Sequence, residues 1–253
     1  MKKIAICLGV LFWTLASMTA QAQDYPRGDV DQDGKVTISD VTSLIDYLLS
    51  GSWPEDVHEW VDLGLPSGTL WATCNVGANS PEEYGDYFAW GETEPKDYYN
   101  WSTYKWCNGS GVALTKYCTS SSYGNNGFVD NKTELDPEDD AAYVNWGPEW
   151  RMPTTEQQRE LYEKCSSDWT TVNGVNGLLF TGPNGNTLFL PAAGYRNEEF
   201  LRSAGSWTLN WSRTLYSDEP SYAYDLDVDS WTVSWGSNRY FGYTVRAVRV
   251  SQN

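Results

Sequence analysis

The most regular apolar pattern in the chain lies near its N-terminus. Apolar side chains recur there at spacings of three and four residues, at Ile38, Val41, Leu44, Ile45, Leu48 and Leu49. This period places them on one face of an α-helix, and Gly51 suits the position just after a helix end. The pattern predicts an amphipathic helix over 38–49, whose apolar stripe must pack on the main domain, on a second copy or on a partner.

From Glu59 onward the pattern changes to short apolar runs, many of which alternate with a period of two, as strands do. Strands are predicted at 59–63, 69–76, 178–181, 186–190, 222–228 and 243–250, with a buried strand end at 87–91. The turn Gly182-Pro183-Asn184-Gly185 predicts a hairpin. Capping residues predict short helices from Ser80, from Asp136 and from Thr154, the last running to about Cys165. This pattern indicates an α+β fold.

The first 22 residues have the features of a targeting signal rather than of a folded domain. Lys2 and Lys3 precede an apolar run over 4–15, and Ala20-Gln21-Ala22 fits the small-x-small pattern of a cleavage site. About 12 apolar residues are too few to cross a bilayer as a helix. Residues 1–22 are therefore predicted to be a signal peptide. We expect an exported protein that is periplasmic, cell-surface or extracellular, in which disulfides are permitted.

The charge balance excludes two classes of partner. Lys and Arg number 17 against 34 Asp and Glu, which gives a formal net charge of −17. A nucleic-acid-binding protein needs a basic face, and so does a protein that docks on anionic lipid. No internal run is long and apolar enough to predict a membrane span in the mature chain.

The sharpest motif is a twelve-residue acidic loop directly before the predicted helix. It begins at Asp29, and its candidate calcium ligands are Asp29, Asp31, Asp33, the backbone carbonyl of Lys35, Thr37 and Asp40. Gly34 stands at the sixth position, where such a loop turns sharply. Hard oxygen ligands at this spacing suit Ca²⁺ better than Mg²⁺, which prefers a stricter octahedron. Residues 23–53 are thus predicted to form a small Ca²⁺-binding module, followed by a linker over 54–58.

This loop and helix, over 28–51, resemble one repeat of a type I dockerin. A dockerin has two such repeats and binds a cohesin. Only one repeat is found here, because the other acidic run, Asp225-Leu226-Asp227-Val228-Asp229-Ser230, lacks the glycine and the closing acid. That run is interpreted as the alternating wet face of a strand. The resemblance implies a cohesin-like partner or a second dockerin-like copy.

Residues 59–250 carry a series of motifs that resemble another family. They are Val61-Asp62-Leu63-Gly64-Leu65-Pro66-Ser67-Gly68, Trp71-Ala72-Thr73-Cys74-Asn75-Val76-Gly77-Ala78, Gly85-Asp86-Tyr87-Phe88-Ala89-Trp90-Gly91-Glu92, Asp139-Asp140-Ala141-Ala142, Trp150-Arg151-Met152-Pro153-Thr154, Leu190-Pro191-Ala192-Ala193-Gly194, Trp211-Ser212 and Gly242-Tyr243-Thr244-Val245-Arg246-Ala247-Val248. This part is similar to the Fibrobacter succinogenes major paralogous domain. The resemblance implies a C-type-lectin-like fold, related to that of sulfatase-modifying-factor domains, but no defined activity.

Catalytic patterns are sparse. His58 is the only histidine and lies in the linker, so His-dependent nucleophilic sites and multi-histidine zinc sites are not predicted. The chain lacks the calcium-and-sugar tripeptides of calcium-dependent lectins and the C-terminal cysteine pair of formylglycine-generating enzymes. A pair of catalytic carboxylates stays open, because acids are plentiful.

Four cysteines remain in the mature chain: Cys74, Cys107, Cys118 and Cys165. They allow three pairings. Cys107 and Cys118 could close a short ring, and Cys74 could bridge to Cys165. Buried free thiols are the alternative for the second pair.

The 14 Trp and 17 Tyr fall into two groups. Trp71, Trp90, Trp146, Trp150 and Trp211 lie within the family motifs and are predicted to be core. Trp101, Tyr104, Trp106, Trp231, Trp235 and Tyr240 lie in polar stretches and are predicted to bind a ligand, since flat rings stack on sugars. The alternative is that these rings pin long loops to the body.

Taken with the resemblances, these features predict an exported, non-catalytic module that recognises a glycan or a surface protein and carries a Ca²⁺-binding segment for assembly. Two alternatives stay open. One is a polysaccharide-degrading enzyme, or a subunit of one, with the dockerin-like segment as a tag, and the other is a structural subunit of a surface appendage.

Overall fold

The computed structural model describes residues 58–228, 233–234 and 236–250. These residues belong to the second of two units into which the chain divides, 1–54 and 55–253. The predicted signal peptide, calcium loop and helix therefore lie outside the described residues. Within them, no helix has the length and apolarity needed to cross a membrane.

A three-stranded antiparallel sheet joins the two ends of the described region. It consists of β1 (Trp60–Asp62), β2 (Thr69–Ala72) and β12 (Val248–Val250), with β2 in the middle. Trp71 pairs with Val61 on one side and with Val248 on the other. The strands predicted here are present, but those predicted over 69–76 and 243–250 are longer than the observed β2 and β12.

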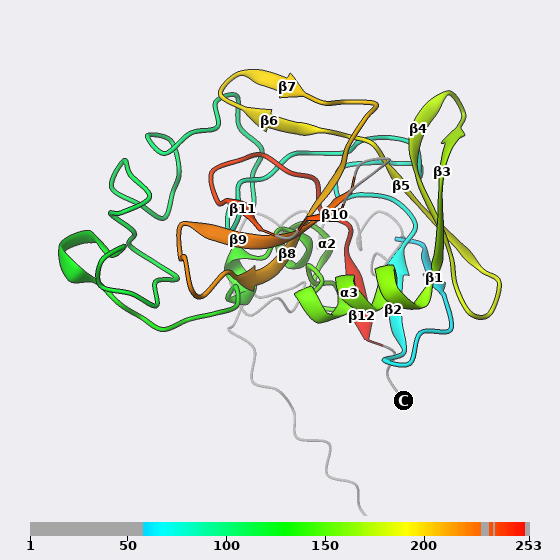
Figure 1. Ribbon diagram of the computed structural model, residues 1–253, viewed down its shortest axis with the longest axis horizontal. Coiled ribbons are helices and arrows are strands. Elements are labelled where there is room, and N and C mark those ends of the chain that lie inside the picture. The colour runs from blue at the N-terminus through cyan, green and yellow to red at the C-terminus, as the bar shows by residue number, and fades with distance from the viewer. Residues whose placement is uncertain (1–57, 229–232, 235, 251–253) are drawn as a thin grey trace, which may run out of the picture. The chain divides into compact units, whose positions relative to one another are not determined.

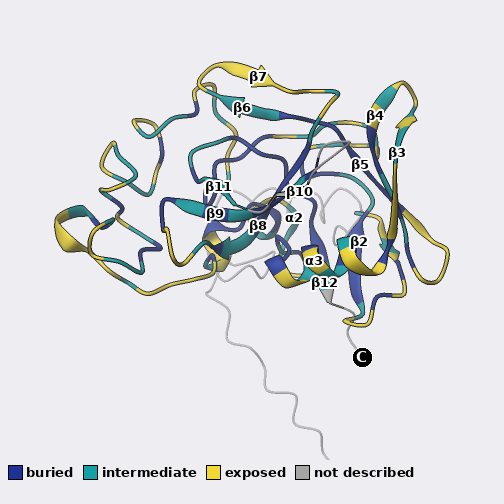
Figure 2. Cartoon of the chain, viewed as in Figure 1, coloured by how far each residue is buried: buried dark blue, intermediate teal, exposed yellow. Residues whose placement is uncertain are grey.

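The second sheet is built around β9. Its members are β8 (Thr208–Leu215), β9 (Tyr222–Val228), β10 (Val233–Ser234) and β11 (Ser237–Asn238), and β9 pairs antiparallel with each of the other three. A register shift interrupts the pairing of β8 with β9 between Trp211 and Leu215. The strand predicted over 222–228 is confirmed, whereas β8 was not predicted. Figure 2 shows both strands largely in the colours of buried and half-buried residues.

Two further antiparallel groups follow one another in the chain. β3 (Ser166–Val172), β4 (Val175–Thr181) and β5 (Thr187–Pro191) form a three-stranded sheet, which contains the predicted hairpin around Gly182-Pro183-Asn184-Gly185. β6 (Tyr195–Asn197) and β7 (Phe200–Arg202) form a separate hairpin, at the top of Figure 1. The described region thus consists mostly of small antiparallel sheets with few helices, an α+β or mainly β fold.

The helix predicted from Thr154 is confirmed as α3 (Thr155–Lys164), with Cys165 just after its end. The Thr154 side chain accepts a hydrogen bond from the backbone N of Gln157, and the Gln157 side chain accepts one from the backbone N of Thr154. This reciprocal capping box satisfies two N–H groups that a helix start would otherwise leave unpaired.

The helix predicted from Asp136 begins later. Asp136 precedes the 3₁₀ turn η2 (Pro137–Asp139), and Asp140 then caps α2 (Ala141–Trp146). The buried Asp140 carboxylate accepts hydrogen bonds from the backbone N of Ala142 (2.9 Å), Tyr143 (3.1 Å) and Met152 (2.9 Å). Asp140 therefore fixes both the start of α2 and the chain that leads into α3. A second 3₁₀ turn, η1, spans Asn125–Gly127.

The helix predicted from Ser80 is absent, and 79–83 forms turns and bends. The Glu83 carboxylate accepts from the backbone N of Asn79, one residue before the position that a capping box requires. Gly85 follows with φ +74°, and a Cβ built on it would lie 2.4 Å from the Val76 carbonyl oxygen. The chain reverses there before a helix can propagate.

The tryptophans that the sequence assigns to the core are buried, except that Trp146 is half-buried. Trp90, Trp150 and Trp211 lie in one apolar cluster, which Phe88 and Tyr243 also join. Trp71 lies in a second cluster, between α3 and the sheet of β3, β4 and β5. These large rings supply much of the buried apolar area of a domain whose strands are short.

A buried arginine also holds the sheets together. Arg246 is 1 % exposed, and its guanidinium donates to the Asn75 Oδ1 (2.9 Å) and to the carbonyl oxygens of Ala72 (3.2 Å), Thr73 (3.1 Å) and Phe189 (3.0 Å). All four acceptors are neutral. Burial accordingly lowers the pKa of Arg246 to about 9.

The interpretation of 225–230 as the wet face of a strand is wrong for Asp225. Asp225 of β9 is fully buried, and the chain that returns at Gly236 lies against its carboxylate. Its carboxylate accepts a hydrogen bond from the backbone N of Gly236, and burial raises its pKa to about 7. Asp229 and Ser230 lie outside the described residues.

The described cysteines are all free, so neither predicted bridge is present. The Cys107 Sγ lies 3.1 Å from the Trp101 carbonyl oxygen, and the Cys118 Sγ lies 3.1 Å from that of Ser120. Each thiol donates to its own turn rather than facing the other. For the second pair, the alternative of buried free thiols is confirmed for Cys165, whereas Cys74 is free but only half-buried.

Candidate functional site

The candidate site lies where the long connection between β2 and η1 returns to the body. Figure 1 shows this connection as irregular chain on the side of β9 and β11. An aromatic cluster attaches it, made of the buried Tyr87, Tyr99 and Tyr104 with Tyr84, Trp101, Trp106 and Tyr240 packed against them. The loop is therefore held by ring packing rather than by regular secondary structure.

A buried arginine side chain anchors the loop to the body of the domain. Arg239 is fully buried and donates to the Tyr104 hydroxyl (2.8 Å) and to the carbonyl oxygens of Tyr117 (2.9 Å), Lys116 (3.1 Å) and Pro220 (2.9 Å). Burial raises the pKa of Tyr104, so its hydroxyl stays protonated. Arg239 thus ties two points of the loop to the segment before β9.

A buried carboxylate, that of Asp139, provides a second anchor for the loop. Asp139, 2 % exposed, accepts from the Tyr117 hydroxyl (2.7 Å) and pairs with Lys116 (2.5 Å) and Lys105 (3.4 Å). Burial and the hydrogen bond to Asp139 both raise the pKa of Tyr117. The predicted helix start around 136–140 therefore holds the loop through side chains, in addition to capping α2.

Two of the predicted ligand-binding rings serve this anchoring. Tyr104 is buried, and its hydroxyl donates to the Trp90 carbonyl oxygen at 2.7 Å. The Trp106 indole donates to the Gly91 carbonyl oxygen at 2.6 Å, and the ammonium groups of Lys105 and Lys116 lie over its ring. These two rings fit the alternative expectation that aromatic residues pin the loop to the body.

Trp101 and Tyr240 are placed differently. Both are half-buried, and their ring centroids lie 5.0 Å apart. Tyr240 contacts Phe241 at 4.6 Å, Phe241 contacts Tyr195 at 5.3 Å, and Tyr195 stacks on Trp207 at 6.4 Å. We call this series of five half-buried rings the aromatic row.

The aromatic row crosses four segments of the chain. Trp101 comes from the long loop, Tyr195 from β6, Trp207 from the approach to β8, and Tyr240 and Phe241 from the turn after β11. Trp101 and Tyr240 can be recognised in the sequence as candidates, whereas the other three rings cannot, because only the tertiary structure brings the five into contact. Backbone hydrogen bonds between Tyr99 and Glu198, in both directions, tie the loop to the β6–β7 hairpin.

Polar groups border the aromatic row. The exposed Glu198 and Glu199 form the tip of the β6–β7 hairpin, and Arg196 of β6 lies over the Tyr87 ring at 5.3 Å. A cavity of about 290 Å³ between this strand and the loop is lined by Asp86, Lys96, Asp97 and Arg196, among others. The rings that line this cavity are Tyr87 and Tyr99 rather than those of the aromatic row. Its mixed donors and acceptors suit a hydroxylated ligand.

The remaining predicted site residues are not placed. Trp231 and Trp235 lie outside the described residues, as do the calcium ligands Asp29, Asp31, Asp33, Lys35, Thr37 and Asp40. In the part of the chain that the structure describes, no group of three or more His, Cys, Asp or Glu side chains could hold a metal ion.

Comparison of the chain with family models, with curated proteins and with solved structures finds no match.

Proposed function

We propose that this protein is an exported, non-catalytic module that binds a neutral glycan along the aromatic row. The observation that carries the proposal is the contact series Trp101–Tyr240–Phe241–Tyr195–Trp207, in which each ring is half-buried. Half-burial fixes a ring in place and leaves part of it to solvent. Such preordered rings bind with little loss of conformational entropy.

The charge of the chain selects the type of glycan. With a net charge of −17, the protein repels polyanions over most approach directions. A neutral polysaccharide has no such penalty, and the C–H faces of its sugars match aromatic rings. The aromatic row contains several rings in series, so it suits consecutive sugar units of one oligosaccharide better than a single monosaccharide.

The first test measures neutral glycan binding by variants of the row. A glycan array identifies the ligand, and titration calorimetry then compares variants with the wild type. Trp101→Ala and Tyr240→Ala are expected to weaken binding by about 1–3 kcal/mol each, the cost of removing an anchoring ring. Trp101→Phe keeps a ring in place and is expected to retain most of the affinity.

The matched control is Trp60→Ala, which removes an exposed ring of β1 outside the row. It is expected to bind as the wild type does. Equal losses in Trp60→Ala and Trp101→Ala, or no neutral glycan bound by the wild type, would contradict the proposal.

The wider assignment rests on the sequence resemblances. Small antiparallel sheets with few helices suit a C-type-lectin-like domain of the Fibrobacter succinogenes major paralogous family. Within the proposal, the dockerin-like segment is the assembly element, and its apolar stripe packs on a cohesin-like partner or on a second copy.

The second test concerns calcium. The apo loop concentrates four Asp carboxylates, at 29, 31, 33 and 40, against the single cation Lys35. Ca²⁺ is expected to bind and to relieve this repulsion, and Asp29→Ala is expected to lose the binding, because Asp29 supplies the first ligand of the loop. Calorimetry with millimolar Ca²⁺ checks both. A wild type that gives no heat, or a variant that gives the same heat, would refute the site.

A further inference from the structure

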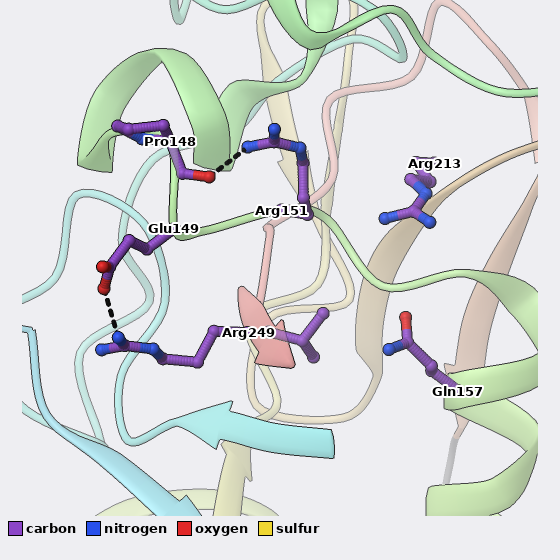
Figure 3. A pocket seen from close by; sticks show the side chains of 7 residues that line it. Pro148, Glu149, Arg151, Gln157, Arg213 and Arg249 are labelled. Atoms are coloured by element: carbon purple, nitrogen blue, oxygen red, sulfur yellow. Dashed lines mark hydrogen bonds and ion pairs between the residues drawn. The ribbon is translucent and has the colours of Figure 1, made fainter. Parts of the chain in front are cut away.

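A pocket on a different part of the surface gathers three of the nine arginines of this acidic chain. Arg151, Arg213 and Arg249 line a cavity of about 260 Å³, together with Gln157 of α3 and the carboxylate of Glu149 (Figure 3). We call it the arginine pocket. Its volume lies just below the usual range of about 300–1,000 Å³ for small-molecule sites, so it has room for one small group.

Two of the guanidinium groups are held in place by contacts with neighbouring protein groups. The Arg151 Nη1 donates to the carbonyl oxygens of Pro148 (2.9 Å) and Trp150 (2.7 Å), and its guanidinium stacks on the Tyr143 ring at 3.8 Å. Arg213 donates through its Nε to the Glu134 carboxylate at 3.1 Å. The positions of these two cations are therefore set before any ligand arrives.

The positive charges repel one another. Burial lowers the pKa of Arg151, the Asp140 carboxylate and Tyr143 oppose this shift, and the nearby charge of Arg213 adds to it. An anion between the two groups would remove this repulsion. Such relief is available only to a negatively charged ligand.

The carboxylates already present are weak competitors. Glu149 pairs with Arg249, and Glu134 pairs with Arg213, but the side chains of Glu149 and Glu134 are 45 % and 51 % exposed. Ion pairs this exposed contribute only about 0–1 kcal/mol each. The lining itself carries three cations and one carboxylate, that of Glu149, so it is positive in a chain whose net charge is −17. The buried Asp140 carboxylate lies behind the lining and attracts Arg151 and Arg213 from that side.

We propose that the arginine pocket binds the carboxylate of an acidic monosaccharide unit, a hexuronate. Guanidinium groups bind carboxylates through paired, charge-assisted hydrogen bonds, which a neutral sugar cannot form. The cavity accepts one such unit, and the acidic surface around it disfavours a polyanionic chain. The proposal of a carboxylate ligand is based on the arginines alone, whereas the proposal that the ligand is a sugar depends on the proposed glycan function.

The pocket and the aromatic row are separate sites. Trp207 of the row directly precedes β8, and Arg213 lies six residues further along this strand. A fully extended strand would place the two about 20 Å apart, and none of the five rings of the row lines the pocket. The effect of a substitution on ligand binding at one site can therefore be measured while the residues of the other site stay unchanged.

The test titrates the full chain with sodium glucuronate, and with glucose as the neutral match, by calorimetry or NMR. Glucuronate is expected to bind at least tenfold more tightly than glucose. Arg213→Gln is expected to weaken glucuronate binding at least tenfold, and Glu149→Gln to strengthen it severalfold by removing a competing carboxylate. Arg159→Gln, which changes an exposed arginine of α3 outside the pocket, is expected to bind as the wild type does.

Equal binding of glucuronate and glucose would overturn the proposal, and so would a Glu149→Gln variant that binds no more tightly. Inorganic sulfate that binds as tightly as glucuronate would show a general oxyanion site, and an acidic peptide that binds instead would assign the pocket to a protein partner; either result rejects the sugar. Should Arg213→Gln fail to fold, the opposite effect of Glu149→Gln still decides. Glucuronate binding without any neutral glycan binding would reject the proposed function and leave the pocket standing.

Discussion

Replacing Arg246 by methionine is expected to lower the free energy of unfolding by about 3–6 kcal/mol, because several buried acceptors lose their donor at once. The guanidinium satisfies the Asn75 side chain and the carbonyl oxygens of Ala72, Thr73 and Phe189. Methionine fills similar space but donates nothing. Each buried polar group left without a partner costs about 1–3 kcal/mol.

Urea denaturation of the wild type and of the variant measures this difference. The control is Arg246→Lys, which keeps a charge but offers one compact ammonium group in place of a fork that spans four acceptors. Its loss is expected to be smaller than that of the methionine variant. A methionine variant within about 1 kcal/mol of the wild type would show that water replaces the guanidinium at these acceptors.

Replacing Asp140 by alanine is expected to cost about 3–5 kcal/mol, since it removes the cap of α2 and the acceptor of the Met152 N–H together. The carboxylate accepts from Ala142, Tyr143 and Met152, and these donors come from two segments that no regular pairing joins. The change is expected to loosen α2 and the start of α3 as one unit. Urea denaturation measures the loss.

Asp140→Asn is the matched variant, because its Oδ1 can keep accepting from the same three donors. Burial raises the pKa of Asp140 to about 6, above its usual value near 3.8. The stability that this carboxyl contributes is therefore present below pH 4 and is lost as the pH rises through about 6. From pH 4 to pH 8, the asparagine variant should gain roughly 2–3 kcal/mol relative to the wild type. A pH-independent difference would contradict this assignment.

Where the structure follows the sequence, the signals are local. Thr154 and Gln157 form the capping box that their spacing predicts, and the turn over 182–185 joins β4 to β5. Such signals depend on residues three or four apart, so they can be recognised without knowing the rest of the fold.

Where the structure differs from the interpretation of the sequence, the contacts responsible join residues that are far apart in the chain. Tyr104 has an aromatic, polar setting like that of Trp101, yet Arg239, 135 positions later, makes it interior. Tyr195 and Trp207 join the aromatic row only because the β6–β7 hairpin folds between them. Asp225 lies on an alternating run, yet its carboxylate is buried where the backbone of Gly236 returns to it, 11 positions later. No periodicity contains this information.

The free cysteines have a chemical consequence for how the chain is produced. Burial raises the pKa of the thiols of Cys74, Cys107, Cys118 and Cys165, so at neutral pH very little thiolate is present. Because the thiolate is the attacking species in thiol–disulfide exchange, these side chains react slowly with oxidised glutathione or with a second copy. The described domain therefore has no disulfide for a reductant to break, and its thiols are expected to stay reduced longer in oxidising surroundings than exposed thiols of ordinary pKa would.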